Sequence, residues 1–232
     1  MYILTFDIDW VPQFIVEDII RRLRNYGLKA TFFCTSPLDF KGTDNIELAI
    51  HPNFMSDSTQ GDSEDEILKN LKDTYPEACG VRTHRLFWYS GLVEKIKNNG
   101  IVYDNSLFLP FHERLQPVDY FGIRRIPFWW SDNLHLINNY SLDRVDLPNM
   151  QVNGLKVLNF HPIHIFLNTC DVMEFKKSII NLQPLENQKL YMFDKYVNRG
   201  IGMASFFDLM CRHIKRLQPE TVRLKDVMCQ KI

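Results

Sequence analysis

The sequence predicts an α/β fold, with strands and helices alternating along one large domain that covers residues 1–232. The clearest evidence is an amphipathic helix over residues 16–26, which lies between two apolar strands at residues 2–6 and 30–34. A strand, a helix and a strand within about 34 residues form a βαβ unit, whose strands pair in parallel through a right-handed crossover. Apolar and amphipathic stretches continue to alternate afterwards, so we expect a parallel barrel or sheet.

The remaining elements follow from the same patterns. Gly27 is expected to end the first helix, because glycine readily adopts the left-handed conformation found after a helix C terminus. Further strands are predicted at residues 46–50, 80–83, 101–103, 154–160 and 221–224, and further helices at residues 64–74, 92–98 and 205–217. Three segments look non-repetitive: an exposed loop at 56–65, an irregular, aromatic-rich stretch at 110–154, and an excursion over one face at 181–200.

Composition narrows the class of protein. The net charge is −1, with acidic and basic residues mixed along the chain, so there is no electrostatic footprint for nucleic acid or for a membrane surface. Five cysteines are scattered without a CxxC pair, which is typical of reduced thiols. No leader-like segment precedes the first strand, and no apolar run is long enough to span a bilayer. We therefore expect a cytoplasmic protein, whose oligomeric state the sequence leaves open.

Chemically capable side chains follow the predicted strands. Asp7 and Asp9 come at the end of the first strand, and two carboxylates that lie close together need a cation or a shared proton. Four other predicted strands also lead to such residues. In chain order these residues are His51 after the strand at 46–50, Arg82 and His84 at the strand 80–83, Asp104 after 101–103, and His161 and His164 after 154–160. The carboxyl ends of parallel strands lie at the same rim of a barrel, so we expect these side chains to lie close together. Their types predict a metal site with an adjacent acid and base.

Several of these motifs, in this order, resemble the polysaccharide deacetylases, also known as NodB-homology domains or carbohydrate esterase family 4. The resemblance is carried by Thr5-Phe6-Asp7-Ile8-Asp9, by residues 27–33 and by the later histidines and arginine, and it extends over most of the chain. The segments 51–54, 82–84 and 128–130 are similar to a WbmS-like branch linked to bacterial surface-polysaccharide clusters. The resemblance implies a single-domain, distorted (β/α)7-type barrel.

It also implies hydrolytic removal of an acetyl group with the help of a divalent metal, often zinc, that polarises the carbonyl and positions water. By position, Asp7 would be the general base, and Asp9 and His51 would be metal ligands. Arg82 would orient Asp7 and balance its charge, since its planar fork suits a carboxylate. His161 would be the general acid that protonates the leaving group.

The chain departs from the family pattern at the metal ligands. The second metal histidine of the family falls four residues after the first, and here that position is Met55. His84 is our candidate for the missing ligand, because it follows the next strand end, and Asn53 is a weaker one. The first motif also has Ile8 between its aspartates, which changes the relative direction of the two carboxylates.

Other residues are candidates for contact with substrate, each with a structural alternative. Trp130, in Phe128-Trp129-Trp130, would stack on a sugar ring or simply pack in the core. Asp132 would contact substrate, orient His161 or Arg82, or serve as a turn residue. Asp104 would line the site or form an Asx turn. His164 would line the site as a partner of His161.

We therefore predict a cytoplasmic, metal-dependent hydrolase that removes an acetyl group, above all N-acetyl, from a carbohydrate. The expected substrate is an amino sugar, a sugar nucleotide or a lipid-linked precursor of a bacterial surface polysaccharide. Two alternatives stay open. A degenerate, non-catalytic domain that binds a saccharide or a protein would explain Met55. A haloacid-dehalogenase-like phosphatase would use Asp7 as nucleophile and Cys34-Thr35-Ser36 as a later motif, but it leaves the histidines without a role.

Overall fold

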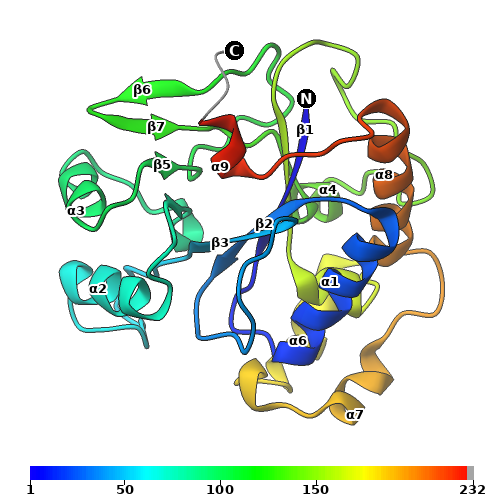
Figure 1. Cartoon of the computed structure of the whole chain (residues 1–232). Helices are drawn as coiled ribbons and strands as arrows, with labels where there is room; N and C mark the ends of the chain where they lie inside the picture. Colours follow the sequence, from blue (N-terminus) through cyan, green and yellow to red (C-terminus); the bar gives the residue numbers. More distant parts are fainter. Residues whose placement is uncertain (229–232) are drawn as a thin grey trace.

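The computed structural model describes residues 1–228 (Figure 1). The end of the domain expected over 1–232, and with it Cys229, lies outside the described residues. In the described part the sheet has the order β6-β7-β5-β4-β3-β2-β1-β9-β8. Its strands are β1 Tyr2–Asp7, β2 Ala30–Cys34, β3 Ile46–Ile50, β4 Gly80–Val81, β5 Tyr103–Asp104, β6 Val118–Tyr120, β7 Ile123–Arg125, β8 Trp130–Ser131 and β9 Lys156–Phe160.

The sheet curls into a distorted barrel. Every pair in the run β5-β4-β3-β2-β1-β9-β8 is parallel, and only β6 pairs antiparallel, with β7. The two ends of the run meet where a parallel bridge joins Phe108, beyond β5, to Phe128, ahead of β8. The backbone N–H of Leu109 donates to Phe128 O at 3.0 Å, and Phe128 N–H donates to Leu107 O at 2.9 Å. The predicted α/β barrel fold is confirmed.

Helices cover the outside of the curled sheet. They are α1 Gln13–Tyr26, α2 Glu64–Thr74, α3 Leu92–Asn98, α4 Asp132–Ile137, α5 Pro162–Phe166, α6 Val172–Ile180, α7 Leu190–Phe193, α8 Met203–Leu217 and α9 Leu224–Val227, with 3-10 turns η1 His84–Leu86, η2 Leu185–Asn187 and η3 Asp194–Tyr196. Helix α1 buries Ile15, Ile19 and Leu23 and ends at Gly27, whose φ of 62° is the left-handed conformation expected there. Helices α1 and α8 pack together on the right of Figure 1.

Two sequence predictions of local structure are wrong. Residues 221–224 do not form a strand, because side-chain hydroxyls rather than a neighbouring strand take the backbone donors around them. Thr221 Oγ1 accepts from Lys29 N–H at 2.7 Å, and Thr31 Oγ1 accepts from Leu224 N–H at 2.9 Å, where α9 begins. The stretch 110–154 is not wholly irregular, since it contains β6, β7, β8 and α4. Elements of two to six residues carry too little periodicity to be recognised in sequence.

The architecture brings the strand ends together at one end of the barrel. Phe6 of β1 lies against Phe32 of β2, Phe160 of β9 and Phe207 of α8, and this aromatic cluster packs between the sheet and α8. In Figure 1, β1 runs downward from the N terminus, and the segment from α6 to α7 lies beyond its end, at the bottom. Within residues 1–228, each helix is too short or too polar to cross a bilayer.

Candidate active site and metal centre

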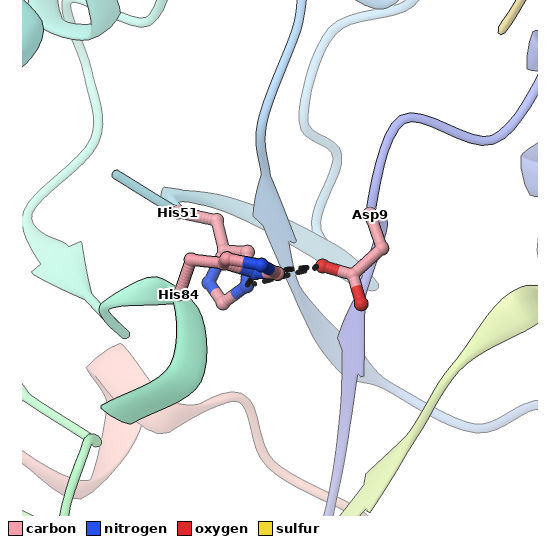
Figure 2. A group of neighbouring side chains, drawn as sticks. All are labelled: Asp9, His51 and His84. Carbon is pink, nitrogen blue, oxygen red and sulfur yellow. Dashed lines mark hydrogen bonds and ion pairs between the residues drawn. The ribbon is translucent and has the colours of Figure 1, made fainter. Parts of the chain in front are cut away.

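Three potential metal ligands converge at the carboxyl ends of β1, β3 and β4. Asp9 Oδ1 lies 3.3 Å from His51 Nε2 and 3.3 Å from His84 Nδ1, and the two ring nitrogens are 3.4 Å apart. Figure 2 shows both imidazoles directed at one carboxylate oxygen of Asp9. These are the two predicted ligands together with His84, the residue proposed from sequence in place of Met55.

The backbone turns sharply to present Asp9. Strand β1 ends at Asp7, and Asp9 and Trp10 then adopt left-handed conformations with φ of 43° and 56°. Residues other than glycine pay a conformational cost at positive φ, which persists only where surrounding contacts enforce it. Here Trp10 N–H donates to Thr35 Oγ1 at 3.0 Å, and Val11 N–H donates to Ile8 O at 3.1 Å. The turn, rather than strand alternation, sends the carboxylates of Asp7 and Asp9 to different partners.

His84 is also placed by a short, constrained turn. It begins η1, directly after β4, where its backbone N–H donates to Pro52 O at 2.8 Å. The next two residues, Arg85 and Leu86, have φ of 54° and 57°. The Trp10 ring meets the His84 ring edge to face, with centroids 5.2 Å apart. Contacts with both its backbone and its ring therefore fix the position of His84.

The donor set fits a divalent cation such as zinc. His51 Nδ1 donates to the carbonyl of Arg82 at 2.6 Å, so a neutral His51 directs the lone pair of Nε2 at the carboxylate. Asp9 Oδ1 is buried and has no hydrogen-bond donor of its own. Ligands about 2.1 Å from a tetrahedral zinc stand about 3.4 Å from one another, which is the spacing of these three atoms.

The electrostatics of this cluster also call for positive charge. Burial alone would raise the pKa of Asp9, but its contacts with His51 and His84 hold that pKa well below its usual value. Burial would likewise lower the pKa of His51, yet the carboxylates of Asp7 and Asp9 raise it. The site therefore stabilises either a proton or a cation between these side chains.

Asp7 pairs with Arg82 instead. Arg82 is fully buried, and its Nη1 donates to Asp7 Oδ1 at 2.7 Å. The same guanidinium also bonds Asn159 Oδ1, Asn105 Oδ1 and, at 2.9 Å, Thr5 Oγ1. Asn159 Nδ2 donates to Asp7 Oδ2 at 2.8 Å. Burial opposes ionisation of Asp7, but the charges of Arg82, His51 and His161 together outweigh it and lower the pKa of Asp7 below its usual value.

His161 lies opposite, supported by Asp132. Its Nδ1 donates to Asp132 Oδ1 at 2.6 Å, and its backbone N–H donates to Asp132 Oδ2 at 2.5 Å. Its Nε2 is 3.6 Å from Asp9 Oδ2 and 3.8 Å from Asp7 Oδ2. Burial would lower the pKa of His161, but Asp132 and the two aspartates of β1 raise it to about 10. In this state His161 is protonated at neutral pH and directs a proton toward Asp7 and Asp9.

His164 is buried beside His161 and stays neutral. Its Nε2 donates to Asn133 Oδ1 at 3.1 Å, its Nδ1 faces Thr169 Oγ1 at 3.2 Å, and burial lowers its pKa to about 4. Asp132, His161 and His164 form a second group with the spacing of metal ligands. Because hydrogen bonds already join Asp132 to His161 and occupy both ring nitrogens of His164, the group of Asp9, His51 and His84 is the better candidate for a metal site.

Two cavities meet at this centre. The larger, about 490 Å³, opens outward along residues of α5, α6 and η2, and the smaller, about 290 Å³, extends inward to Asp7. Both are lined by Asp9, His84, Arg85, Asn133 and His161. The outer cavity has an apolar wall of Ile163, Phe175, Ile179 and Leu185, and the inner one is bordered by Phe108 and Phe128. A volume of several hundred Å³ is typical of small-molecule sites.

Two expected substrate contacts are wrong. Trp130 is fully buried, with its ring packed on Phe160 and Phe206, so it cannot stack on a sugar. Asp104 is also fully buried; it accepts from Arg125 Nε at 2.8 Å and from Ser106 N–H at 2.9 Å, and it borders neither cavity. Both side chains come from short strands and are buried, Trp130 between β9 and α8 and Asp104 against Arg125.

Asp132 is buried behind His161, which matches the orienting role considered for it and leaves no surface for substrate. Asn53, the weaker candidate ligand, is engaged within its own loop, where its Oδ1 accepts from Met55 N–H at 3.0 Å.

Sequence analysis missed the amides and hydroxyls that support the charged groups. Asn159, Asn105 and Thr5 surround Arg82, and Asn133 lies between His161 and His164. The available signal was a polar residue inside an otherwise apolar strand, as at Thr5 and Asn159. Such residues must find buried partners, because an unpaired polar group in a core is costly.

Comparisons with known proteins agree with this fold. A structure from Bordetella bronchiseptica, named as a candidate polysaccharide deacetylase involved in O-antigen biosynthesis, has a TM-score of 0.80 at 24% identity, covering 91% of this chain and 90% of that one. A candidate polysaccharide deacetylase from Mycobacterium smegmatis has a TM-score of 0.55 at 13% identity, covering 100% and 91%. The 4-alpha-glucanotransferase of Thermococcus litoralis has a TM-score of 0.51 at 10% identity, covering 98% and 38%.

At these identities the solved structures establish the fold alone. A search of curated protein sequences found no match. The family model described as WbmS-like polysaccharide deacetylase, however, matches residues 4–179, which is most of the chain, and this assignment displaces the phosphatase alternative. The chain belongs to the WbmS-like polysaccharide deacetylase family.

Proposed function

We propose that this protein is a metal-dependent hydrolase that removes an acetyl group, above all N-acetyl, from a carbohydrate. Its substrate would be an amino sugar, a sugar nucleotide or a lipid-linked precursor of a bacterial surface polysaccharide. Family membership and the O-antigen role stated for the Bordetella protein support this substrate class. The observation that carries the proposal is the triangle of Asp9, His51 and His84 beside the Asp7–Arg82 and His161–Asp132 pairs.

Asp9, His51 and His84 would hold the metal, which we propose to be zinc. When bound there, such an ion supplies a Lewis acid for the acetyl carbonyl and lowers the pKa of water in its reach. The ligand set of two imidazoles and one carboxylate is also found in other catalytic zinc sites, where a coordination position stays open for water or substrate.

Asp7 would be the general base. Its carboxylate borders the inner cavity, and the charges of Arg82, His51 and His161 together keep it ionised. Although Arg82 and Asn159 each contact one of its oxygens, a carboxylate oxygen has a second lone pair that can accept the proton of the attacking water. Arg82 and Asn159 thereby fix the direction in which Asp7 accepts that proton.

His161 would be the general acid. Asp132 holds Nδ1–H and fixes the ring, so the proton on Nε2 is the one available to the leaving amine. The elevated pKa of His161 keeps that proton in place at neutral pH until the carbon–nitrogen bond breaks. Proton transfer would thus run from water to Asp7 on one side and from His161 Nε2 to the amine on the other.

The direct test is acetate release by purified protein loaded with zinc, with metal content measured by elemental analysis. The substrates would be N-acetylglucosamine, its 1-phosphate, UDP-N-acetylglucosamine and an N-acetylated oligosaccharide. Asp9→Ala and His51→Ala should lose both metal and activity, whereas Asp39→Ala, at an exposed aspartate outside both cavities, should keep both. Binding of a sugar without acetate release from any of these would favour the non-catalytic alternative.

Action in the cytoplasm, on a precursor rather than on a finished polymer, is part of this proposal. The cysteines of residues 1–228 are thiols, not disulfides: Cys34, Cys79, Cys170 and Cys211. Unpaired thiols are typical of reducing compartments. Fractionation of cells that express the native gene, with the protein followed by antibody, would test the location.

A further inference from the structure

Arg85 occupies the junction of the two cavities. It follows the candidate ligand His84 directly and borders both the outer and the inner cavity. Considering the described residues alone, it is the one arginine or lysine in either wall. A positive charge that does not depend on protonation therefore lies next to the proposed site of hydrolysis.

The guanidinium of Arg85 is not used by the protein itself. Among residues 1–228, no carboxylate lies within ion-pair distance of it and no acceptor is bonded to it, in contrast to buried Arg82, which bonds several partners. Asp57 and Glu186 border the outer cavity, but neither pairs with Arg85. The guanidinium of Arg85 is therefore available to bind a ligand.

The backbone presents this side chain at a conformational cost. The φ of 54° at Arg85 is enforced by its neighbours: Leu86 N–H donates to Thr83 O at 3.0 Å, and Thr83 Oγ1 donates to Phe87 O at 2.7 Å. These bonds fix the turn on both sides of Arg85. A strained turn beside a catalytic centre is a recurring way of directing a side chain at a ligand.

The charged residues that border the two cavities indicate which chemical group a ligand at Arg85 would have. In the inner cavity the carboxylates are already committed, since Asp7 is paired with Arg82 and Asp9 faces the two histidines. In the outer cavity Asp57 and Glu186 disfavour an anion next to their carboxylates. The junction at Arg85 is thus the place where an anionic group would be stabilised, and a guanidinium binds phosphate or carboxylate with two parallel hydrogen bonds.

We propose that Arg85 recognises an anionic group, a phosphate or a carboxylate, carried by the acetylated sugar, so that the enzyme selects charged sugars over neutral ones. This inference rests on the proposed deacetylase function and narrows its substrate class. Arg85 would act as a binding and specificity residue, with no part in proton transfer.

The test compares kcat/KM for N-acetylglucosamine 1-phosphate, for the corresponding N-acetylated aminouronate and for neutral N-acetylglucosamine, using zinc-loaded protein. The phosphate and the uronate distinguish the two sources of negative charge. Arg85→Gln should lower the ratio of the preferred anionic substrate to the neutral one by fivefold or more, chiefly through KM. Arg85→Lys should restore part of the ratio, because lysine keeps the charge but not the fork.

Arg114→Gln is a matched control. Arg114 is an exposed arginine with the same φ of 54°, but it borders neither cavity, so it should leave the ratio unchanged. The inference fails if Arg85→Gln changes the ratio by less than fivefold, or if Arg114→Gln changes it equally.

A binding measurement separates this inference from the proposed function. If the wild-type protein releases no acetate from any substrate, the deacetylase proposal fails, and calorimetric titration with N-acetylglucosamine 1-phosphate still tests Arg85. If Arg85→Gln binds the phosphate more weakly than the wild type but binds N-acetylglucosamine equally well, anion recognition by Arg85 is supported even without deacetylase activity. Equal binding of the phosphate by both proteins would overturn it.

Discussion

Nδ1 of His84 lies 3.3 Å from Oδ1 of Asp9, although the second metal histidine of the family pattern falls at a different position in the sequence. That family position is Met55, which comes from the loop after β3, whereas His84 comes from the turn after β4. The second imidazole beside Asp9 thus comes from the turn after β4 and not from the loop after β3. Asp9 therefore has two imidazole neighbours, His51 and His84, although one motif residue is absent.

If His84 is the third ligand, its removal should cost more metal affinity than removal of Met55. We expect His84→Ala to weaken zinc binding by at least tenfold, because it leaves two protein ligands in place of three. Met55→Ala should retain full zinc content, since Met55 borders neither cavity. Competition with a fluorescent chelator measures both affinities. A loss of zinc in Met55→Ala but not in His84→Ala would contradict this ligand set.

Asp7→Asn separates catalysis from metal binding. The asparagine keeps the shape of the side chain but cannot take a proton from water, so we expect kcat to fall by about 10²–10⁴. Zinc content should stay close to that of the wild type, because Asp7 contacts Arg82 and Asn159 and is not among the ligand atoms. Full activity of Asp7→Asn on an acetylated sugar would show that another group is the base.

The stability of the metal-free protein should depend on pH through His161. Its pKa in the folded state is about 10, above the usual value near 6.5, because Asp132, Asp9 and Asp7 favour the charged ring. The charged ring therefore stabilises the fold fully below pH of about 6.5, and this contribution is lost as the pH rises through about 10.

Urea unfolding in the presence of a chelator measures this effect. The difference in free energy of unfolding between wild type and His161→Gln should be largest near a pH of about 6 and should shrink towards about 10. Asp132→Asn, which removes the negative charge beside Nδ1–H, should reduce the same difference. A difference that grows with pH would mean that His161 is neutral in the folded protein.

Trp130 should matter for stability and not for substrate binding. Its ring is fully buried against Phe160 and Phe206, so Trp130→Leu should lower the free energy of unfolding by about 1–3 kcal/mol. KM for an acetylated sugar should stay within about twofold, since no face of the ring reaches either cavity. A large rise in KM with unchanged stability would restore the sugar-stacking role.

Much of the fold and of the candidate site follows from local sequence. An apolar strand that ends in Asp7, and another that ends in His161, can be recognised because strands and their ends leave a pattern in consecutive residues. A parallel arrangement then requires these ends to lie at the same rim, so the sequence is sufficient to group Asp9, His51 and Arg82. Their chemical roles stay a proposal.

The tertiary structure alone decided which partner each of these groups meets. The left-handed turn at Asp9 directs that carboxylate to His51 and His84, while Asp7 remains on the strand beside Arg82. Asn159 and Asn133 could not be assigned from sequence, because an amide has no charge and its role depends on what surrounds it.

The burial of Trp130 and Asp104 was likewise beyond local sequence. Both belong to strands of two residues, and alternation along so short a strand does not specify which side chain points outward. For Trp130, pairing of β8 with β9 beside Leu158 places the ring on the same face as Phe160, against α8. The sequence by itself therefore determined the fold class and the set of reactive residues at the rim, because these depend on consecutive residues. Only the tertiary structure decided their pairing and their access to the cavities, because these depend on contacts between distant parts of the chain.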